Sequence, residues 1–230
     1  MTRHFFRAVI FDLDGVIIDS EPFHWNVNKK LFAALGFAVS PAEYSEFIGV
    51  SNTRMWTVLK RRYSLSPEVP QLVRGQVDGN LAFLKKHAMT PMPGLAGLLR
   101  SLSSRGLKTA IASSSPREYI DLAVKKIGMV NDFPIRVSGE DFLNGKPHPD
   151  IFLKTAELLG EPPARCLVIE DAMHGVAAAK AAGMACVGLA GGQSGNQDLS
   201  RADAIVAGLA DIDDDFLDGL NSGRTPEEPG

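Results

Sequence analysis

Residues 8–15 read AVIFDLDG, and this stretch says most about the fold. Its first four residues form a continuous apolar run that is too short for a helix and is typical of a strand buried on both faces of a sheet. Asp12, Asp14 and Gly15 then end the run abruptly. Strands of this kind belong to parallel sheets, so we expect further apolar runs separated by helices.

The rest of the chain contains five similar apolar runs, at residues 108–112, 135–138, 166–169, 185–189 and 204–206. Helical patterns lie between them, and one begins with Ser115-Pro116-Arg117-Glu118, a capping box with Ser115 as the N-cap. Strands that alternate with helices of this length predict an α/β fold. We expect a Rossmann-like parallel sheet core with helices on both faces.

Residues 17–90 interrupt this alternation. Helices are predicted at 22–35, 41–49 and 51–63, with Ser40 and Ser51 as N-caps of the second and third, and a fourth helical segment runs from Ser66 to Met89. We therefore predict an α/β core of residues 1–16 and 91–220, a small all-helical cap of residues 17–90 inserted after the first strand, and a disordered tail at 221–230. Such a cap lies above the carboxyl ends of the strands, where open α/β sheets bind ligands.

Composition excludes several classes of protein. Of the 230 residues 45% are hydrophobic and 22% are charged, as in ordinary globular proteins and unlike disordered or fibrous chains. The net charge is −3 and the signs are interspersed, so we expect no nucleic-acid partner. Signal-peptide and membrane-spanning patterns are missing, and Cys166 and Cys186 lie in apolar runs typical of buried free thiols. We expect a cytoplasmic protein without a membrane partner, either a monomer or a weak dimer.

Polar residues with chemical potential follow four of the predicted strands. Asp12 and Asp14 follow the first, and carboxylates this close repel one another unless a proton or a cation reduces their charge. A solvated acidic turn is the alternative. Glu170 and Asp171 follow the strand at 166–169, where adjacent acids need a cation or a helix-capping role.

The other two groups suit an anion. Ser113 and Ser114 follow the strand at 108–112, and hydroxyl and N–H groups at a helix start can bind phosphate. Lys146 lies between Gly145 and Pro147, in a stiff loop that presents an ammonium group as a counter-charge. An ordinary surface lysine is the alternative reading of Lys146.

Taken in order, these four groups resemble the motifs of the haloacid dehalogenase superfamily. More closely, the chain is similar to the β-phosphoglucomutase-like branch of sugar-phosphate phosphatases with a helical cap. Residues 11–16 match the first motif, Ser113 the second, Lys146 the third, and Glu170 with Asp171 the fourth. The resemblance covers residues 8–210, and the predicted cap falls where that branch has it.

The resemblance implies a role for each motif. The residue at Asp12 is the nucleophile that becomes an aspartyl phosphate, and Asp14 is the general acid and then the base. Mg²⁺ is held by the Asp12 carboxylate, the Asp14 main-chain carbonyl and Asp171, with Glu170 beside them. The phosphoryl oxygens are bound by Ser113 and Lys146, with Ser114 next to them.

For the cap, the resemblance implies substrate contacts. His24 matches a cap histidine, although a helix-surface histidine near Trp25 is an equal alternative. Residues 49–52, with Gly49, Ser51 and Asn52, match a substrate-specificity loop, although a plain helix–turn–helix connection has the same pattern. We expect hinges at Val16 and at residues 90–93.

Three positions depart from the mutases of this branch, because Ile48, Asn52 and Pro116 stand where those enzymes carry basic residues. A mutase must hold a bisphosphate, so these losses favour a phosphatase. Other cations could compensate: Arg54, Arg117, or the run Lys60-Arg61-Arg62, which is otherwise typical of a solvated helix face.

We therefore expect a Mg²⁺-dependent phosphatase of small phosphorylated metabolites, most simply sugar or polyol phosphates. The alternatives are a phosphosugar mutase and, in a different class, a non-catalytic protein that binds phosphorylated metabolites. A dehydrogenase is disfavoured, because the first strand leads into paired acids rather than a phosphate-binding glycine turn.

Overall fold

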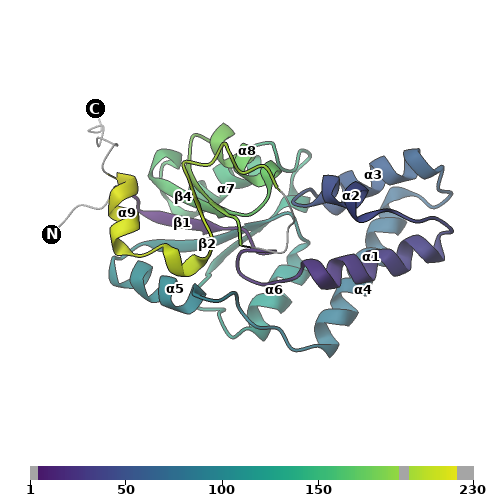
Figure 1. The fold of residues 1–230 in the computed structure, drawn as a ribbon, viewed down its shortest axis with the longest axis horizontal. Coiled ribbons are helices and arrows are strands. Elements are labelled where there is room, and N and C mark those ends of the chain that lie inside the picture. Colours follow the sequence, from purple (N-terminus) through teal and green to yellow (C-terminus); the bar gives the residue numbers. More distant parts are fainter. Residues whose placement is uncertain (1–4, 192–196, 222–230) are drawn as a thin grey trace.

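A six-stranded sheet, all parallel, forms the centre of the computed structural model, which describes residues 5–191 and 197–221 (Figure 1). Its strands lie in the order β3-β2-β1-β4-β5-β6. They are β1 (Ala8–Phe11), β2 (Lys108–Ser113), β3 (Ile135–Ser138), β4 (Cys166–Glu170), β5 (Ala185–Leu189) and β6 (Ala204–Val206). The predicted α/β fold is confirmed, and β2 and β4 each extend one residue beyond the predicted end.

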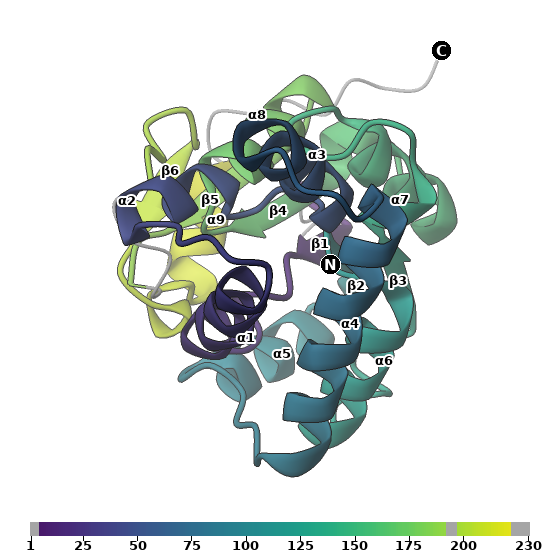
Figure 2. The same cartoon turned by 90° about the vertical axis from the view of Figure 1, so that its right-hand side faces the viewer.

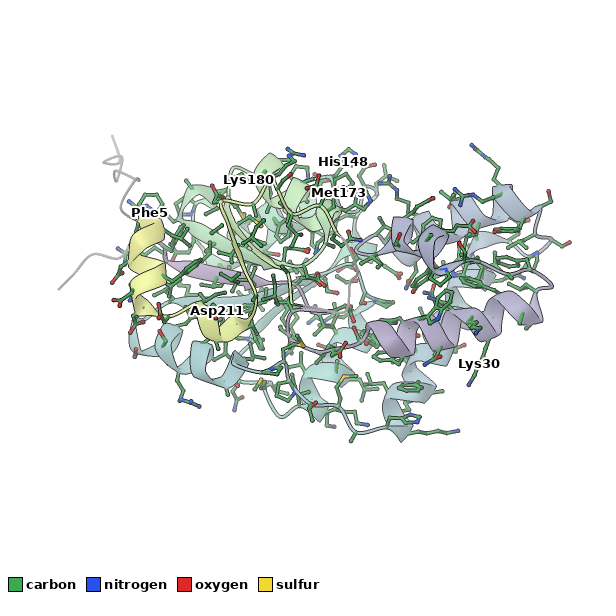
Figure 3. The ribbon with its side chains drawn as sticks, in the orientation of Figure 1. Phe5, Lys30, His148, Met173, Lys180 and Asp211 are labelled. Atoms are coloured by element: carbon green, nitrogen blue, oxygen red, sulfur yellow. The ribbon has the colours of Figure 1, made fainter. Side chains whose placement is uncertain are left out.

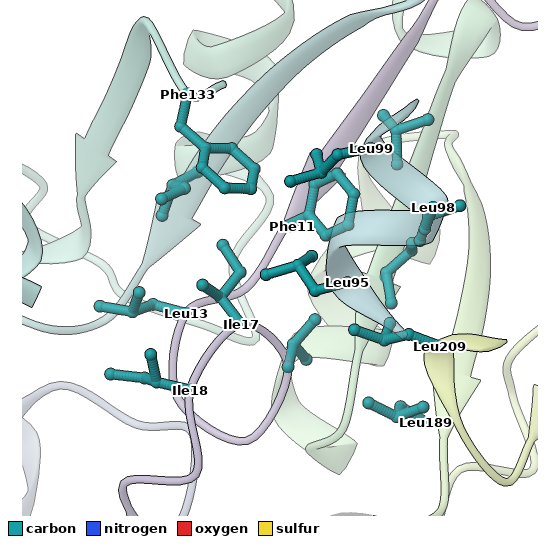
Figure 4. Close-up of a cluster of buried hydrophobic side chains, with 14 of the residues drawn as sticks. Phe11, Leu13, Ile17, Ile18, Leu95, Leu98, Leu99, Phe133, Leu189 and Leu209 are labelled. Carbon is teal, nitrogen blue, oxygen red and sulfur yellow. The ribbon is translucent and has the colours of Figure 1, made fainter. Parts of the chain in front are cut away.

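Helices cover both faces of the sheet because successive strand residues point to opposite sides. Phe11 packs with α5 (Leu95–Ser104), α6 (Arg117–Lys126) and α9 (Asp214–Asn221), whereas Ile10 packs with α7 (Asp150–Leu159) and α8 (Met173–Ala181). Figure 4 shows the first of these layers, with Leu95 and Leu99 of α5 beside Phe11. Both faces of the strands are therefore apolar, as the continuous apolar runs predicted.

Four further helices lie beyond the carboxyl ends of the strands, between β1 and α5 (Figures 1 and 2). They are α1 (Glu21–Ala34), α2 (Pro41–Tyr44), α3 (Asn52–Tyr63) and α4 (Val69–Lys86), and we call residues 21–86 the helical unit. The unit has an apolar core of its own around Phe32, Trp56 and Leu59, while Lys30 projects away from the molecule (Figure 3).

The chain leaves the sheet and returns to it at one place. Met92 N donates to Ile17 O at 2.8 Å, and Ile18 forms an isolated bridge with Pro91. The domain boundaries at residues 16 and 90 stay a prediction, but the two crossing segments are paired where those boundaries fall.

Ser115 is not the N-cap of α6, so that prediction was wrong. The cap position is Pro116, which makes no side-chain bond, and the Ser115 hydroxyl donates instead to Asp14 at 2.7 Å. The hydroxyl has a charged partner in the segment after β1, and a hydrogen bond to a carboxylate is stronger than one between neutral groups, so it fixes the side chain toward Asp14. Ser40 and Ser51 do cap α2 and α3, as predicted.

Two helix boundaries also differ from the prediction. The helix expected at 41–49 is α2 followed by a 3₁₀ turn, Ser45–Phe47. The fourth begins at Val69 rather than near Ser66, because Lys60 Nζ donates to the carbonyl groups of residues 65–67 and holds them out of the helix.

Cys166 and Cys186 are free and buried, as predicted. No helix within the described ranges is both long and apolar enough to cross a membrane. The predicted disordered tail, apart from Asn221, lies outside the described residues. The cytoplasmic location stays a prediction.

Candidate active site

A cavity of about 70 Å³ lies between the carboxyl ends of β1, β2 and β4 and the helical unit. Two sets of residues line it, one from each side. From the sheet side come Asp12, Asp14, Ser113, Ser114, Ser115 and Asp171. From the helical unit come His24, Tyr44, Phe47, Ile48, Gly49, Val50, Asn52, Met55 and Gln76. Residues far apart in the sequence therefore face one cavity beside β1 and β4, the neighbouring strands at which the strand order reverses, where open α/β sheets bind ligands.

Asp12 follows directly after β1, and its carboxylate is fixed at both oxygens. Oδ1 accepts a hydrogen bond from Lys146 Nζ at 2.6 Å, and Oδ2 accepts one from the backbone N–H of Asp14 at 3.0 Å. The side chain is buried, and burial raises the pKa of Asp12 to about 7 while the Lys146 ammonium group lowers it. This environment excludes the solvated acidic turn that the sequence left open.

Lys146 is only 1% exposed, so it is not a surface lysine. Its Nζ donates to Asp12 Oδ1, to Glu170 Oε1 at 2.6 Å and to the carbonyl oxygen of Ala112 at 3.0 Å. Burial alone would lower the pKa of Lys146, but the two carboxylates raise it. The ammonium group therefore stays charged behind Asp12, and Lys146 does not line the cavity as placed here.

Glu170 is the last residue of β4 and lies away from the cavity. Its Oε1 pairs with Lys146, and its Oε2 accepts hydrogen bonds from the backbone N–H groups of Asp171 and Ala172, at 2.9 and 3.0 Å. A Cβ at Gly175 would lie 1.7 Å from Glu170 Oε1, so only glycine leaves room for this carboxylate. The structure thus gives Glu170 a supporting position, between Lys146 and the loop that carries Asp171.

Asp14 is the second acid of the pair, and donors from both sides of the cavity surround it. Its Oδ1 accepts from the Ser20 hydroxyl and contacts His24 Nε2 at 3.0 Å, and its Oδ2 accepts from the Ser115 hydroxyl. Burial alone would raise the pKa of Asp14, but His24 and the two hydroxyls outweigh burial and lower the pKa. His24 is therefore a cavity residue, not a helix-surface histidine.

The oxygen atoms present suit a hard divalent cation. Asp12, Asp14 and Asp171 face one cavity, and the ammonium group of Lys146 contacts Asp12 from behind it. In the part of the chain that the structure describes, no three Asp, Glu, His or Cys side chains form a complete metal cluster. Mg²⁺ fits such a site, because it takes few protein oxygens and keeps water or phosphate in its shell.

Ser113 and Ser114 have different hydrogen-bond partners. Ser113 Oγ, at the end of β2, accepts a hydrogen bond from Ser115 N at 3.0 Å and lines the cavity. The Ser114 hydroxyl donates to Gly49 O at 3.0 Å, which joins the sheet side to the helical unit. Both serines line the cavity, and the Ser114 hydroxyl also joins the sheet side to the helical unit.

The segment 48–52 of the helical unit approaches the sheet side closely. Gly49 has a positive φ of 78°, and a Cβ on it would lie 2.6 Å from the Ala172 Cβ. Asn52 lines the cavity and its Nδ2 donates to Glu140 Oε1 at 3.3 Å, whereas Ser51 caps α3 and does not line the cavity. Glycine at position 49 is thus required by both the backbone and the approach.

The cations proposed as substitutes for the lost basic residues lie elsewhere. Arg117 contacts Asp121 and the carbonyl oxygen of Arg136, and it does not line the cavity. Lys60 holds the turn after α3, and Arg62 pairs with Glu43 at 2.6 Å. No Lys or Arg is found among the described residues that line the cavity.

Sequence reasoning gave no role to Tyr44, Gln76 or Tyr119. Tyr119 OH lies 3.4 Å from Asp14 Oδ1, and the other two line the cavity. A signal existed for Gln76, because it is, with Asn80, one of two polar residues on the mostly apolar buried face of α4 between Leu72 and Leu84. Buried polar residues on such faces need a partner or a ligand.

Comparisons with known proteins agree with this architecture. The model of the haloacid dehalogenase-like hydrolase family matches residues 9–189, which include the cavity residues from both sides. The putative phosphatase YhcW of Bacillus subtilis is 30% identical over 221 residues, covering 94% of this chain and 98% of that protein.

Two further matches differ in coverage. The chloroplastic protein SUPPRESSOR OF QUENCHING 1 of Arabidopsis thaliana is 33% identical over 217 residues, which cover 91% of this chain but 20% of that protein. The crystal structure of β-phosphoglucomutase from Clostridium difficile superposes with a TM-score of 0.83 at 26% identity, covering 95% of this chain and 98% of that one.

Proposed function

This chain belongs to the haloacid dehalogenase-like hydrolases, as its four motifs predicted, and from this premise we propose that it is a Mg²⁺-dependent phosphatase of small phosphorylated metabolites. Family membership makes the chain a hydrolase, and its phosphatase relative supports phosphate monoesters as substrates. The proposed substrates are sugar or polyol phosphates, and the proposed intermediate is an aspartyl phosphate on Asp12.

One observation carries the proposal: the carboxyl groups of Asp12 and Asp14 face the same small cavity but have different hydrogen-bond partners. Asp12 is backed by a buried lysine, and Asp14 is surrounded by hydroxyl and imidazole groups. It is the shared position of the two carboxyl groups at one cavity that suits a nucleophile beside an acid–base residue, because the raised pKa of Asp12 by itself disfavours the nucleophilic carboxylate.

In the first step, the Asp12 carboxylate attacks phosphorus and forms a new P–O bond. The bond from phosphorus to the leaving oxygen breaks, and Asp14 gives its proton to that oxygen. In the second step, Asp14 takes a proton from water while the water oxygen attacks phosphorus. The bond to Asp12 then breaks, which releases phosphate and restores the carboxylate.

Asp14 needs its proton in the first step and must lose it in the second. The lowered pKa of Asp14 suits the second step, because it favours the carboxylate that accepts a proton from water. A bound phosphate monoester brings negative charge next to Asp14, and like charge raises the pKa for the first step. The negative charge of the substrate therefore favours the protonated form of Asp14 in the first step, when Asp14 must act as the acid.

Asp12, Asp171 and the main-chain carbonyl of Asp14 would hold Mg²⁺, which supplies positive charge beside the phosphoryl oxygens and favours the ionised form of Asp12. Lys146 offsets the charge of Asp12 from behind. The Ser113 hydroxyl lines the cavity and would bind a phosphoryl oxygen. These groups act where negative charge gathers in the transition state.

The cavity favours hydrolysis over a mutase reaction. A mutase must hold a bisphosphate, and a second phosphate group would find no Lys or Arg among the described residues lining this cavity. The structural likeness to a β-phosphoglucomutase keeps the mutase as the competing function. It predicts a different product: isomer that needs a bisphosphate activator and little free phosphate.

The test is phosphate release from a panel of phosphorylated metabolites, with Mg²⁺ and with EDTA. Asp12→Asn should lower turnover by more than about 10³-fold, because it removes the nucleophile. Asp19→Asn is the matched control, since Asp19 is exposed and does not line the cavity. Normal turnover by Asp12→Asn, or turnover unaffected by EDTA, would reject the mechanism.

A further inference from the structure

Gln76 is a buried residue in the middle of α4, and the oxygen atom of its carboxamide is held by a hydrogen bond. The indole Nε1–H of Trp56 donates to Gln76 Oε1 at 2.7 Å. Trp56 is completely buried in the core of the helical unit, so its ring cannot follow a rotation of the carboxamide. The indole is a donor only, and it therefore selects the oxygen end of Gln76 as its partner.

The other end of the same carboxamide is left for the cavity. Gln76 lines the cavity, and within the described ranges no residue accepts a hydrogen bond from its Nε2. An amide nitrogen carries two N–H donors. At the wall of the cavity these donors can bind acceptor oxygens of a ligand.

The surroundings of Gln76 limit which acceptors fit. Tyr44 lines the same wall, and its hydroxyl oxygen accepts a hydrogen bond from Asn28 Nδ2 at 2.8 Å. Met55 and Phe47 complete the wall with apolar surface. Neutral polar groups on an apolar wall can bind the hydroxyl groups and carbon atoms of a polyhydroxylated ligand. A second phosphate group would lose its hydration there and find no Lys or Arg among the described lining residues.

We propose that Gln76, held in place by Trp56, is a specificity-determining residue that donates a hydrogen bond to a hydroxyl oxygen of an uncharged, polyhydroxylated leaving group. The inference rests on the proposed phosphatase function, and it adds a substrate preference set in the helical unit. Trp56 is a positioning residue, because it acts only through Gln76.

The experiment compares two phosphate monoesters that differ in the leaving group. Glucitol 6-phosphate carries hydroxyl groups, and phenyl phosphate carries none. The measured quantity is the ratio of their kcat/KM values, which cancels any effect on phosphoryl transfer itself. The folded state of each variant is checked by thermal unfolding.

Gln76→Glu is the main variant, because a carboxylate keeps the volume and can still accept the hydrogen bond from Trp56 while the N–H donors are lost. We expect the ratio to fall by about three- to tenfold, chiefly through a higher KM for glucitol 6-phosphate. Gln76→Met should act in the same direction. Trp56→Phe should also lower the ratio, because Gln76 Oε1 then loses the donor that fixes its orientation.

Gln71→Met is the matched control, since Gln71 is exposed on the same helix and does not line the cavity. An unchanged ratio in both Gln76 variants, with normal phosphate release, would overturn the inference and leave the phosphatase standing. No release from either substrate by the unaltered protein would overturn both. A ratio that falls equally in Gln71→Met would also reject the assignment to Gln76.

Discussion

Gly175→Ala tests whether Glu170 supports the active site from behind. The added Cβ would lie 1.7 Å from Glu170 Oε1 and 1.9 Å from its Cδ, and an ordinary contact of 3.4 Å requires the oxygen to move by about 1.7 Å. Glu170 is 1% exposed and is held by Lys146 and two backbone N–H groups, so it cannot move that far and keep them. The substitution therefore breaks a buried ion pair without touching the cavity.

The magnitude follows from two opposing effects. Breaking one side of a buried ion pair costs about 3–5 kcal/mol, and alanine in place of glycine in a helix returns about 1 kcal/mol. We expect the free energy of unfolding to fall by about 2–4 kcal/mol, measured by urea denaturation. Displacing the partner of Lys146 should also lower kcat by roughly 10²-fold, since small misplacements at a reacting centre are costly.

Gly97→Ala is the matched control, because Gly97 is also the third residue of its helix but has no atom closer than 3.9 Å to an added Cβ. It should leave activity unchanged and raise stability by up to about 1 kcal/mol. Wild-type stability and turnover in Gly175→Ala would refute the reasoning, since Glu170 would then be free to move without cost.

Two further predictions concern groups outside the cavity. Burial raises the pKa of the Cys166 thiol to about 12, so the folded state favours the neutral thiol. The free energy of unfolding should therefore fall as pH rises from about 9 toward 12. Urea titrations across this range should show that it falls less steeply with pH in Cys166→Ala. Lys60→Met removes an ammonium group that donates to the carbonyl groups of residues 65 and 67 at 2.9 Å, and it should cost about 1–3 kcal/mol by thermal unfolding, whereas Arg61→Ala on the exposed face should cost less than about 0.5 kcal/mol.

The sheet could be predicted from the sequence because its signals are local. Most strands are short apolar runs, and four of them are followed by polar motifs, so the alternation of such runs with helices indicated a parallel sheet with a site at the carboxyl ends of its strands. The caps at Ser40 and Ser51 were predictable for the same reason, since the hydroxyl and its N–H partner lie within one turn.

Contacts between distant segments could not be predicted in this way. Ser115 has the residues of a capping box, yet its hydroxyl binds Asp14, which is 101 residues earlier. Lys146 has the sequence context of a surface loop, yet a pocket formed by β1 and β4 buries it. In both cases a carboxylate supplied by another strand decides the outcome, and no local pattern reports it.

The small volume of the cavity bears on substrate access. About 70 Å³ is below the roughly 300 Å³ of an ordinary ligand pocket, so we expect the helical unit to move when a sugar phosphate binds. The segment 48–52 contacts the sheet side through two polar bonds, from the half-buried Ser114 hydroxyl to Gly49 O at 3.0 Å and from Asn52 Nδ2 to Glu140 Oε1 at 3.3 Å. One such hydrogen bond contributes only about 0.5–1.5 kcal/mol.

The opposite end of the helical unit is held differently. Lys126 of α6 donates to the carbonyl groups of Leu84 and His87, at the last turn of α4, and the crossing segments are paired through Ile17 and Met92. A charged donor on several helix-end carbonyls is a stronger contact than a rim ion pair. The α4–α6 contact at Lys126 therefore holds this end of the helical unit more firmly than the two bonds of the segment 48–52 hold the other end, and the hinges at residues 16 and 90–93 stay a prediction.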